Sequence, residues 1–433
     1  MPSSYGKDFD IMNITVAPSV PHGKIRAISS KSAAHRILIC AAFAETETVI
    51  RCDKTNKDIE ATADCLRAMD ASIEYEKPYF RVTPIKTPIN GAVLNCNESG
   101  STLRFLLPII PAIGIDACFD LAGRLPERPL SPLYEELIAH GASLSPQGSN
   151  PLTSRGKLHG EEYRIRGDVS SQFISGLLFA LTFSRQGGKL IIEGKTESAP
   201  YIDMTVDALR LFGAAPEKTD YGYLVAPDAR LYSPDGELAV EGDWSNAAFP
   251  LCMGAIGNGS VTVTGLDPAS HQGDMAVVEI LRRFGADVEI CADEFTVTGG
   301  KKLCGIEIDA TQIPDLVPVL ATVASVAEGK TVISGAARLR LKESDRLMTV
   351  RTMLTSLGAD VTETEDGLII VGKEKLTGGI TDSFNDHRIA MSAAVAAIAC
   401  TSPVTINGAE CASKSYPEFW TDIKELLDIK LVL

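Results

Sequence analysis

One short pattern recurs through this chain and limits its possible folds more than any other feature. A leucine is followed four residues later by Gly-Ala, in full copies that span residues 137–142, 209–214, 281–286 and 354–359. A degenerate copy begins at Leu66, where Asp70 replaces the glycine, and Leu426 falls where a sixth copy would begin. Because the copies are about 72 residues apart, the sequence predicts six structural repeats.

Two further features share this period. Each full copy is typical of the end of an amphipathic helix that stops at a glycine. Short β-rich segments precede these helices at residues 48–50, 117–119, 189–192, 261–263, 331–333 and 404–406. Before each of these strands lies an Ala-rich segment that is apolar on nearly every side, beginning near His35, Ser101, Ser171, Asn246, Asp315 and His387. A helix that is apolar all round must be buried, so each repeat is predicted to hold one buried helix between strands.

Six buried helices need strands wrapped around them, and two lobes of three repeats each are the simplest arrangement. The predicted fold class is therefore α/β with two lobes. Three periods separate the lobe boundaries, so one lobe is expected at residues 30–240 and the other at residues 1–29 plus 241–433. The predicted N-terminal strand at residues 11–16 would then belong to the second lobe.

Composition and charge exclude several classes of protein. A chain that is 45% hydrophobic and 22% charged is typical of a folded globular protein. The formal net charge of −15 argues against nucleic acid or an anionic membrane as partner. The ten cysteines include no C-x-x-C pair, which indicates reduced thiols. No apolar run reaches the roughly 20 residues that span a bilayer, and the N-terminus lacks a signal-peptide pattern, so a soluble cytoplasmic protein is expected.

The polar motifs of the chain lie at the predicted N-termini of the buried helices, at residues 31–36, 100–104, 170–173, 243–246, 314–316 and 386–388. Capping alone would explain any one of them, because Ser, Asp and Gly are favoured there. Helix N-termini also attract anions, however, and these carry Lys31, Arg36, Arg104 and Arg388. More cations lie in polar loops, at Arg124, Arg128, Lys342, Arg346 and Lys414. The set predicts two facing surfaces that bind phosphate and carboxylate groups.

Other chemistries find little support in the sequence. It contains no G-x-x-x-x-G-K-[ST] or G-x-G-x-x-G segment, which argues against a nucleotide site. The six histidines form no H-E-x-x-H motif and no spaced Cys/His cluster, so no metal is expected. No G-x-S-x-G segment indicates a hydrolase.

Eight segments resemble, in order, the motifs of the enolpyruvyl transferases, in particular the 5-enolpyruvylshikimate-3-phosphate synthase family. They are residues 30–36, 99–104, 127–129, 170–173, 200–205, 341–347, 386–391 and 413–417. The resemblance implies a two-lobed enolpyruvyl transferase fold with three β-α-β-α-β-β units per lobe, closing on substrate. It implies transfer of the enolpyruvyl group of phosphoenolpyruvate to shikimate 3-phosphate in aromatic amino acid biosynthesis. It further implies no metal and no organic cofactor, and we expect a monomer.

The resemblance also assigns site residues. Shikimate 3-phosphate would contact Lys31, Ser32, Arg36, Ser170, Ser171, Gln172, Ser198, Tyr201, Asp315 and Lys342. Phosphoenolpyruvate would contact Lys31, Gly100, Arg124, Gln172, Arg346, Arg388 and Lys414. As catalytic residues, Asp315 would take the hydroxyl proton, and Glu343 or Lys31 would deliver or remove the proton at C3. From the residues alone, Asp315 could equally be only a helix cap and Glu343 only a partner of Arg346.

Several residues depart from the family pattern, among them Ala27 and Ile28, which replace the usual Pro-Gly-like segment before Ser30. Glu98 stands where a neutral residue is usual, and Phe105 where Pro or Leu is common. Trp244 is bulkier than the small residue expected near the hinge. Arg338 occupies a position where an Asn often meets the shikimate phosphate. These changes are expected to affect affinity and response to an inhibitor such as glyphosate, for which Gly100 leaves room, more than the reaction.

Three rival interpretations remain open. A sister enzyme uses UDP-N-acetylglucosamine as acceptor, but its family carries a loop cysteine and a Lys-Asn pair. Here the loop at residues 121–130 has no cysteine, and Ser32 follows Lys31. A ring-shaped DNA clamp would need basic helices, whereas the repeated helices are apolar. A catalytically silent relative would not be expected to keep Lys31, Asp315, Glu343 and Arg388 together.

Overall fold

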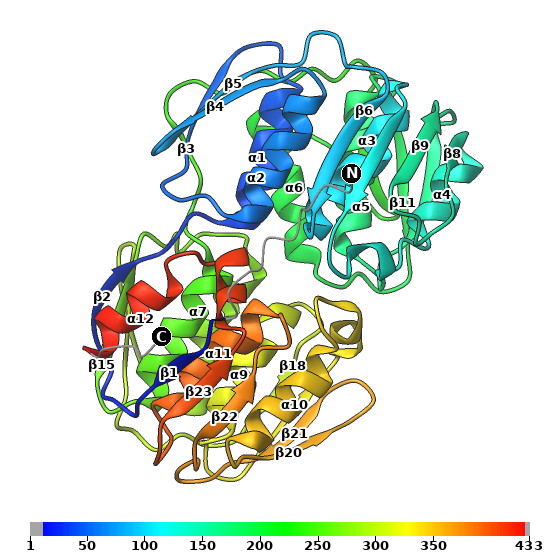
Figure 1. Cartoon of the computed structure of the whole chain (residues 1–433). Helices are drawn as coiled ribbons and strands as arrows, with labels where there is room; N and C mark the ends of the chain where they lie inside the picture. Colours follow the sequence, from blue (N-terminus) through cyan, green and yellow to red (C-terminus); the bar gives the residue numbers. More distant parts are fainter. Residues whose placement is uncertain (1–11, 429–433) are drawn as a thin grey trace, which may run out of the picture.

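The computed structural model describes residues 12–428, which form two lobes joined by two crossings of the chain (Figure 1). Each lobe has its own hydrophobic core. One core draws its buried side chains from residues between Ala33 and Leu238, the other from Ile14 to Ile28 and from Trp244 to Leu427. This division supports the predicted boundaries near residues 29–30 and 240–241, which stay a prediction.

Three units of the same design build the first lobe. In the second and third units, the strand before the buried helix pairs in parallel with the strand after it. In the first unit, residues 238–239 from the far end of the lobe take the place of that preceding strand. In all three, a hairpin closes the four-stranded sheet in antiparallel fashion. The first unit comprises β14 (Leu238–Ala239), α1 (Lys31–Ala42), β3 (Thr48–Arg51), α2 (Lys57–Ala68), β4 (Ser72–Glu76) and β5 (Tyr79–Thr83). The second comprises β6 (Ala92–Asn97), α3 (Gly100–Ile113), β7 (Ala117–Leu121), η1 (Leu125–Glu127), α4 (Leu133–Ala139), β8 (Ala142–Leu144) and β9 (Leu152–Gly156). The third comprises β10 (Glu162–Arg166), α5 (Ser171–Phe183), β11 (Gly188–Glu193), α6 (Ala199–Leu211), β12 (Glu217–Thr219) and β13 (Gly222–Val225).

The second lobe holds three more units of this design, the last of which has a three-stranded sheet with the single strand at residues 14–16 in place of the hairpin. Its first unit comprises β2 (His22–Arg26), α7 (Trp244–Ile256), β15 (Ser260–Thr264), η2 (Gly273–Ala276), α8 (Val277–Phe284), β16 (Asp287–Cys291) and β17 (Glu294–Thr298). The next comprises β18 (Glu307–Asp309), η3 (Pro314–Leu316), α9 (Val317–Ala324), β19 (Lys330–Ser334), η4 (Ala337–Leu341), α10 (Arg346–Ser356), β20 (Asp360–Glu363) and β21 (Leu368–Val371). The last comprises β22 (Gly379–Asp382), α11 (His387–Ala397), β23 (Val404–Asn407), η5 (Ala409–Lys414), α12 (Phe419–Leu427) and β1 (Ile14–Val16).

Three short strands close the lobes by joining sheets far away in sequence. Strands β1 and β2 pair with β23 and β15 of the second lobe, and β14 pairs in parallel with β3 of the first. The two crossings of the chain therefore lie side by side. Ser30 donates its backbone N–H to Glu241 at 2.8 Å, and Asp243 donates to Ile28 at 2.8 Å. This short antiparallel contact is the hinge between the lobes.

The repeat seen in the sequence is confirmed. All six β-rich segments are strands, and all six apolar segments contain helices that are largely buried (α1, α3, α5, α7, α9 and α11). The glycines of the repeat have positive φ, for example 100° at Gly141 and 104° at Gly285. This explains why glycine recurs at the end of each repeated helix. Asp70, in the degenerate copy, adopts φ of 90° instead, as Asp tolerates better than most residues.

Some boundaries differ from the predicted ones. Helix α1 begins at Lys31, four residues before His35, because Ser30 caps it. Near Asp315 the chain first forms the 3-10 turn η3, and α9 begins at Val317. The predicted strand at residues 11–16 is present as β1, and Ile11 lies outside the described residues. No helix within residues 12–428 is long and apolar enough to cross a membrane.

Candidate active site

Five of the six buried helices bring their N-terminal segments to a cleft between the two lobes, whereas the start of α7, at the predicted motif 243–246, does not line it. The first turns of α1, α3 and α5 line it from one side, and η3 and the start of α11 line it from the other. Ser170 caps its helix within the predicted motif, whereas the caps Ser30 and Ser99 lie one residue before the predicted motifs; each of the three accepts a backbone N–H of its own helix. One side-chain cap satisfies only part of the free N–H groups of a helix start, so capping and anion binding are compatible here.

Of the predicted site residues, all but Arg124 and Lys414 line this cleft. The lining includes Lys31, Ser32, Arg36, Gly100, Ser170, Ser171, Gln172, Ser198, Tyr201, Asp315, Lys342, Glu343, Arg346 and Arg388. Residues from both lobes are therefore within reach of one small ligand, whereas their individual roles stay predictions.

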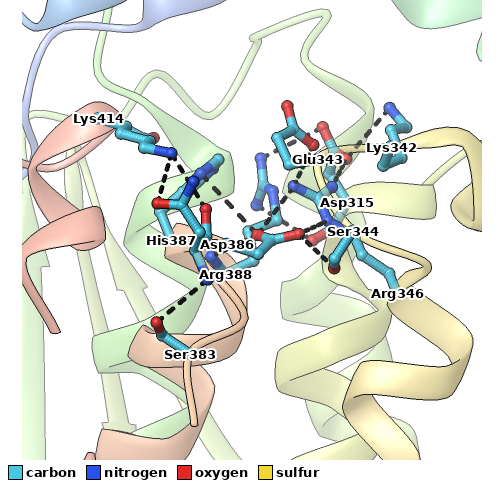
Figure 2. A network of polar contacts seen from close by, with 12 residues as sticks. Asp315, Lys342, Glu343, Ser344, Arg346, Ser383, Asp386, His387, Arg388 and Lys414 are labelled. Carbon is cyan, nitrogen blue, oxygen red and sulfur yellow. Dashed lines mark hydrogen bonds and ion pairs between the residues drawn. The ribbon is translucent and has the colours of Figure 1, made fainter. Parts of the chain in front are cut away.

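Arg346 is the centre of the polar network on the second-lobe side (Figure 2). Its side chain is only 1% exposed and makes ion pairs with three carboxylates. The distances are 2.8 Å to Asp386, 2.9 Å to Asp315 and 2.7 Å to Glu343. Burial works to lower the pKa of Arg346, but these carboxylates raise it above its ordinary value. The guanidinium is thus a fixed positive charge that orients the acids around it.

Asp315 contacts three cations from three different segments. Its oxygens lie 2.9 Å from Arg346, 3.2 Å from Arg388 and 3.5 Å from Lys342. Burial works to raise the pKa of Asp315, but the three cations lower it well below its ordinary value. Asp315 caps no backbone N–H at the start of η3, so the alternative in which it is only a helix cap is wrong.

Glu343 does pair with Arg346, as the simpler alternative predicted, and it also lines the cleft. Its other oxygen lies 3.8 Å from Arg128 of the first lobe. Burial works to raise the pKa of Glu343, but Arg346 and Arg128 lower it well below its ordinary value. The Glu343 carboxylate is therefore ionised in the free protein.

Lys31, on the first-lobe side, is held by Asp58. Its Nζ lies 2.9 Å from the Asp58 carboxylate in the first turn of α2, and its backbone N–H donates to Asp243 at 3.1 Å. Burial works to lower the pKa of Lys31, but Asp58 and Glu343 raise it above its ordinary value. Lys31 is thus an ammonium group that can donate a proton. Sequence reasoning missed Asp58, because nothing in its local pattern indicates that α2 packs beside α1.

Arg36 is a buried cation that no carboxylate neutralises in the described structure. It donates to the Thr205 hydroxyl at 2.8 Å and to the Tyr201 carbonyl at 2.7 Å. Phe105 lies under its guanidinium at 5.0 Å, so this departure from the family pattern supplies a cation–π contact. Burial lowers the pKa of Arg36 to about 10. The negative charge of a bound anion would offset the free-energy cost of burying the Arg36 guanidinium.

Arg104 is a second such cation, beside Gly100. Burial and the neighbouring charge of Arg128 lower the pKa of Arg104 well below its ordinary value. A Cβ on Gly100 would lie 2.5 Å from Nη1 of Arg104 and 2.8 Å from Nη1 of Arg128. Both arginines were predicted as cations of the set but not as ligands of substrate. Their place around Gly100 makes them candidates for anion binding.

Several contacts bridge the cleft from lobe to lobe. Tyr201 donates its hydroxyl to Asp274 at 3.1 Å, and Arg338 reaches across to Ser198 at 3.1 Å and also pairs with Glu197. Arg338 also lines the cleft, at the position where the family often has an Asn that contacts the shikimate phosphate. Asp274, which the sequence did not reveal, is fully buried.

Arg124 and Lys414 lie outside the lining. Arg124 is half exposed and donates to the backbone carbonyl of Glu343 at 3.3 Å. Lys414 pairs with Glu98 of the first lobe at 2.9 Å. Figure 2 shows Lys414 apart from the acids around Arg346. Both predicted donor-binding cations thus bridge the lobes instead of facing the cleft.

Trp244 does not approach the cleft. It is fully buried in the second-lobe core, where its ring meets Phe295 edge-on at 4.6 Å and its indole N–H donates to the Asp267 carbonyl. The expected influence of this departure on the hinge is limited to packing. Among residues 12–428, no cluster of three or more His, Cys, Asp or Glu side chains could hold a metal ion.

Two lobes of repeated units around a cation-rich cleft define an enolpyruvyl transferase. The EPSP synthase from Acinetobacter baumannii superposes on this chain with a TM-score of 0.81 and 28% identity, covering 97% of this chain and all of its own. The enolpyruvyl transferase NikO from Streptomyces tendae has the same fold, with a TM-score of 0.77 and 18% identity, covering 98% of this chain and 99% of its own.

The family follows from sequence. The family profile described as EPSP synthase (3-phosphoshikimate 1-carboxyvinyltransferase) matches residues 17–423. A 3-phosphoshikimate 1-carboxyvinyltransferase from Clostridium kluyveri is 41% identical, covering 95% of this chain and 97% of the relative. One from Methanocorpusculum labreanum is 37% identical, covering 96% and 98%. This chain belongs to the EPSP synthase family, which confirms the predicted family and fold class.

Proposed function

We propose that this chain transfers the enolpyruvyl group of phosphoenolpyruvate to the 5-hydroxyl of shikimate 3-phosphate and releases phosphate. This is the activity of a 3-phosphoshikimate 1-carboxyvinyltransferase in the shikimate pathway. Asp315 carries the proposal, because an ionised carboxylate held by three cations between the lobes suits proton removal beside two anionic substrates.

The acceptor binds mainly on the first lobe. Its ligands are Lys31, Ser32, Arg36, Ser170, Ser171, Gln172, Ser198 and Tyr201, with Asp315 and Lys342 across the cleft. The buried charge of Arg36 supports this arrangement, because a phosphate supplies the negative charge that the free protein lacks there. Arg338, beside Ser198, adds a further positive charge to this side of the cleft.

The donor binds among Lys31, Gly100, Gln172, Arg346 and Arg388 of the cleft lining. Arg124 and Lys414, which lie outside the lining in the free protein, leave their present partners to join them. Gly100 supports this placement, since the absence of a side chain leaves room for an anion near Arg104, Arg128 and the first N–H groups of α3. Gln172, which donates to Ser101 at 2.9 Å, stands between the two substrate regions.

The first chemical step is an addition. Asp315 accepts the proton of the 5-hydroxyl of shikimate 3-phosphate while the hydroxyl oxygen forms a bond to C2 of phosphoenolpyruvate. The electron pair of the C2–C3 double bond takes a proton at C3, and Lys31 supplies it as the protonated group of the site. Substrate anions also neutralise part of the cationic field on Asp315, which raises the pKa of its carboxyl and makes it a better base.

The second step is an elimination from the tetrahedral adduct. Glu343, ionised in the free protein, removes a proton from C3. The C2–C3 double bond re-forms, the bond from C2 to the phosphate oxygen breaks, and Asp315 gives the departing phosphate the proton that it took from the hydroxyl. Glu343 returns the C3 proton to Lys31, which lies within range of its charge, so that all three groups end in their starting protonation states. The surrounding arginines stabilise the phosphate charge as it develops.

Phosphate release from phosphoenolpyruvate tests this function. We expect release with shikimate 3-phosphate and none with UDP-N-acetylglucosamine, the acceptor of the sister enzyme. Release only with the sugar nucleotide would assign the chain to the sister reaction. No release with either acceptor, from folded protein, would contradict the proposed activity.

A further inference from the structure

Lys414 is fully occupied by protein groups before any ligand arrives. Its Nζ lies 2.9 Å from Oε2 of Glu98, 2.9 Å from Oδ1 of Asn385 and 3.1 Å from the Asn385 carbonyl. An ammonium group has three protons, so these three acceptors satisfy it completely. The Lys414 side chain is 17% exposed and that of Glu98 34%, which makes this a partly desolvated pair across the lobes.

Rigid backbone positions hold both sides of this pair. On the first lobe, Glu98 packs against Gly123, where an added Cβ would lie 2.8 Å from the Glu98 carboxyl carbon. Gly123 has φ of 55°, so the close approach and the backbone both require glycine there. On the second lobe, Phe384 and Asn385 have φ of 53° and 55°. Two consecutive non-glycine residues in the left-handed region are strained, as is common where a loop positions a ligand.

The pair also explains why Lys414 lies outside the cleft lining. Its partner Glu98 approaches it from the first lobe, beside the loop that carries Arg124. Two of the cations proposed to bind the donor are lysines, Lys31 and Lys414, and each pairs with a carboxylate of the protein. Lys31 lines the cleft although it pairs with Asp58. Lys414 instead would have to leave its acceptors to reach an anion in the cleft.

We propose that Glu98 is an internal competitor for Lys414 and thereby sets the affinity of the site for its anionic donor. The carboxylate occupies the ammonium group that a small ligand bearing carboxylate and phosphate groups would otherwise engage. This inference rests on the proposed function, in which Lys414 binds phosphoenolpyruvate. Glu98 acts through Lys414 and takes no part in the bond changes.

The direction of the effect follows from the order of events. If Lys414 leaves Glu98 when the donor binds, binding breaks an ion pair that the free enzyme has. Donor binding is then weaker by the free energy of that pair. Removing the Glu98 charge then strengthens donor binding by about two- to fivefold, the range expected for a partly exposed pair. If instead the pair persists in the donor complex, Glu98 helps to hold the lobes closed, and its removal weakens donor binding.

The test compares Glu98→Gln with wild type and with a control, Glu294→Gln. Glu294 forms an ion pair with Lys24 at 2.5 Å on the second lobe, so the control removes the same charge from a surface pair outside the cleft lining. The KM for phosphoenolpyruvate is measured at saturating shikimate 3-phosphate, together with the KM for shikimate 3-phosphate at saturating donor. We expect Glu98→Gln to lower the donor KM about two- to fivefold while the acceptor KM changes less than about twofold. The control should leave both unchanged.

A second variant identifies the route of the effect. In a Lys414→Met background the donor KM should rise, and adding Glu98→Gln should then change it no further, because the competitor has lost its target. A donor KM that is unchanged or raised in Glu98→Gln alone would overturn the inference, as would an equal gain in the Lys414→Met background. Absence of phosphate release in the wild type would contradict the proposed function instead, so the two failures are distinguishable.

Discussion

The hydroxyl of Tyr201 donates a 3.1 Å hydrogen bond to Asp274, and this bond joins α6 of the first lobe to η2 of the second. Asp274 also accepts from Ser245, and its Oδ1 has no hydrogen-bond partner in the described structure. Burial and the nearby charge of Asp315 raise the pKa of Asp274 to about 6, although Arg388 opposes the shift. The hydrogen bond to Asp274 joins the lobes. Because the carboxyl is buried, however, its ionisation lowers the stability of the folded protein.

Asp274→Asn should therefore stabilise the protein at neutral pH. The pKa of Asp274 is about 6 when folded against 3.8 ordinarily, so folding takes up a proton between these values and stability falls as the pH rises through them. The asparagine variant escapes this loss, which amounts to at most about 3 kcal/mol above pH 6. Thermal unfolding at pH 7.5 and pH 4 measures it, with the exposed Asp64→Asn as control. A gain as large at pH 4 as at pH 7.5 would contradict this explanation.

Tyr201→Phe should weaken acceptor binding more than it slows turnover. The ring remains, but the bond to Asp274 is lost, and with it one contact between the two lobes. We expect the KM for shikimate 3-phosphate to rise about five- to tenfold, equivalent to about 1 kcal/mol or slightly more. Steady-state kinetics with shikimate 3-phosphate as varied substrate measure this change. An unchanged KM would mean that the bond between the lobes plays no part in acceptor binding.

The sequence predicted those parts of the fold that local patterns encode. The repeat, its glycines and the buried helices depend on spacing along one segment, and capping serines such as Ser170 mark where each helix begins. The same logic predicted that helix starts on the same side of equivalent units meet, and most of them line one cleft, whereas the roles of the single residues stay predictions. The strand exchange of β14 and the start of α9 depend on distant packing and on Pro314, and local spacing cannot reveal them.

The contacts between lobes were less predictable. Asp58 and Asp274 lie in ordinary polar segments, and only the packing of α2 and η2 brings them to the site. Lys414 was assigned to the donor by its motif, but its partner Glu98 is more than three hundred residues away along the chain. Which of two anions a cation engages depends on geometry that no local pattern encodes.

Lys31→Ala should reduce turnover at least about 100-fold without unfolding the protein. The substitution removes both a positive charge from the cleft and the proposed donor of the C3 proton. Circular dichroism checks the fold, and phosphate release measures the rate. Asp58→Asn serves as comparison, because it loosens Lys31 and keeps the ammonium, and it should cost much less activity. Near-normal turnover of folded Lys31→Ala would contradict its assigned role.

Gly100→Ala should raise the KM for phosphoenolpyruvate at least about tenfold, while the KM for shikimate 3-phosphate changes less. The new Cβ would lie 2.5 Å from Nη1 of Arg104, so that guanidinium and the neighbouring one of Arg128 must move. A displacement of about 1 Å at an anion site is enough for a loss of this size. Ser101→Ala, one position further along α3, serves for comparison, because it removes the contact with Gln172 and adds no close approach. Equal effects of both substitutions would show that the close approach at Gly100 is not the cause.

The central claim, that Asp315 removes the acceptor proton in a cleft between the lobes, is tested most directly by Asp315→Asn. The amide keeps the size of the side chain and removes the base. We predict that phosphate release falls at least about 100-fold, while shikimate 3-phosphate, measured by calorimetry, binds within about tenfold of its wild-type affinity. Turnover within a few-fold of wild type, in a folded variant, would contradict the account.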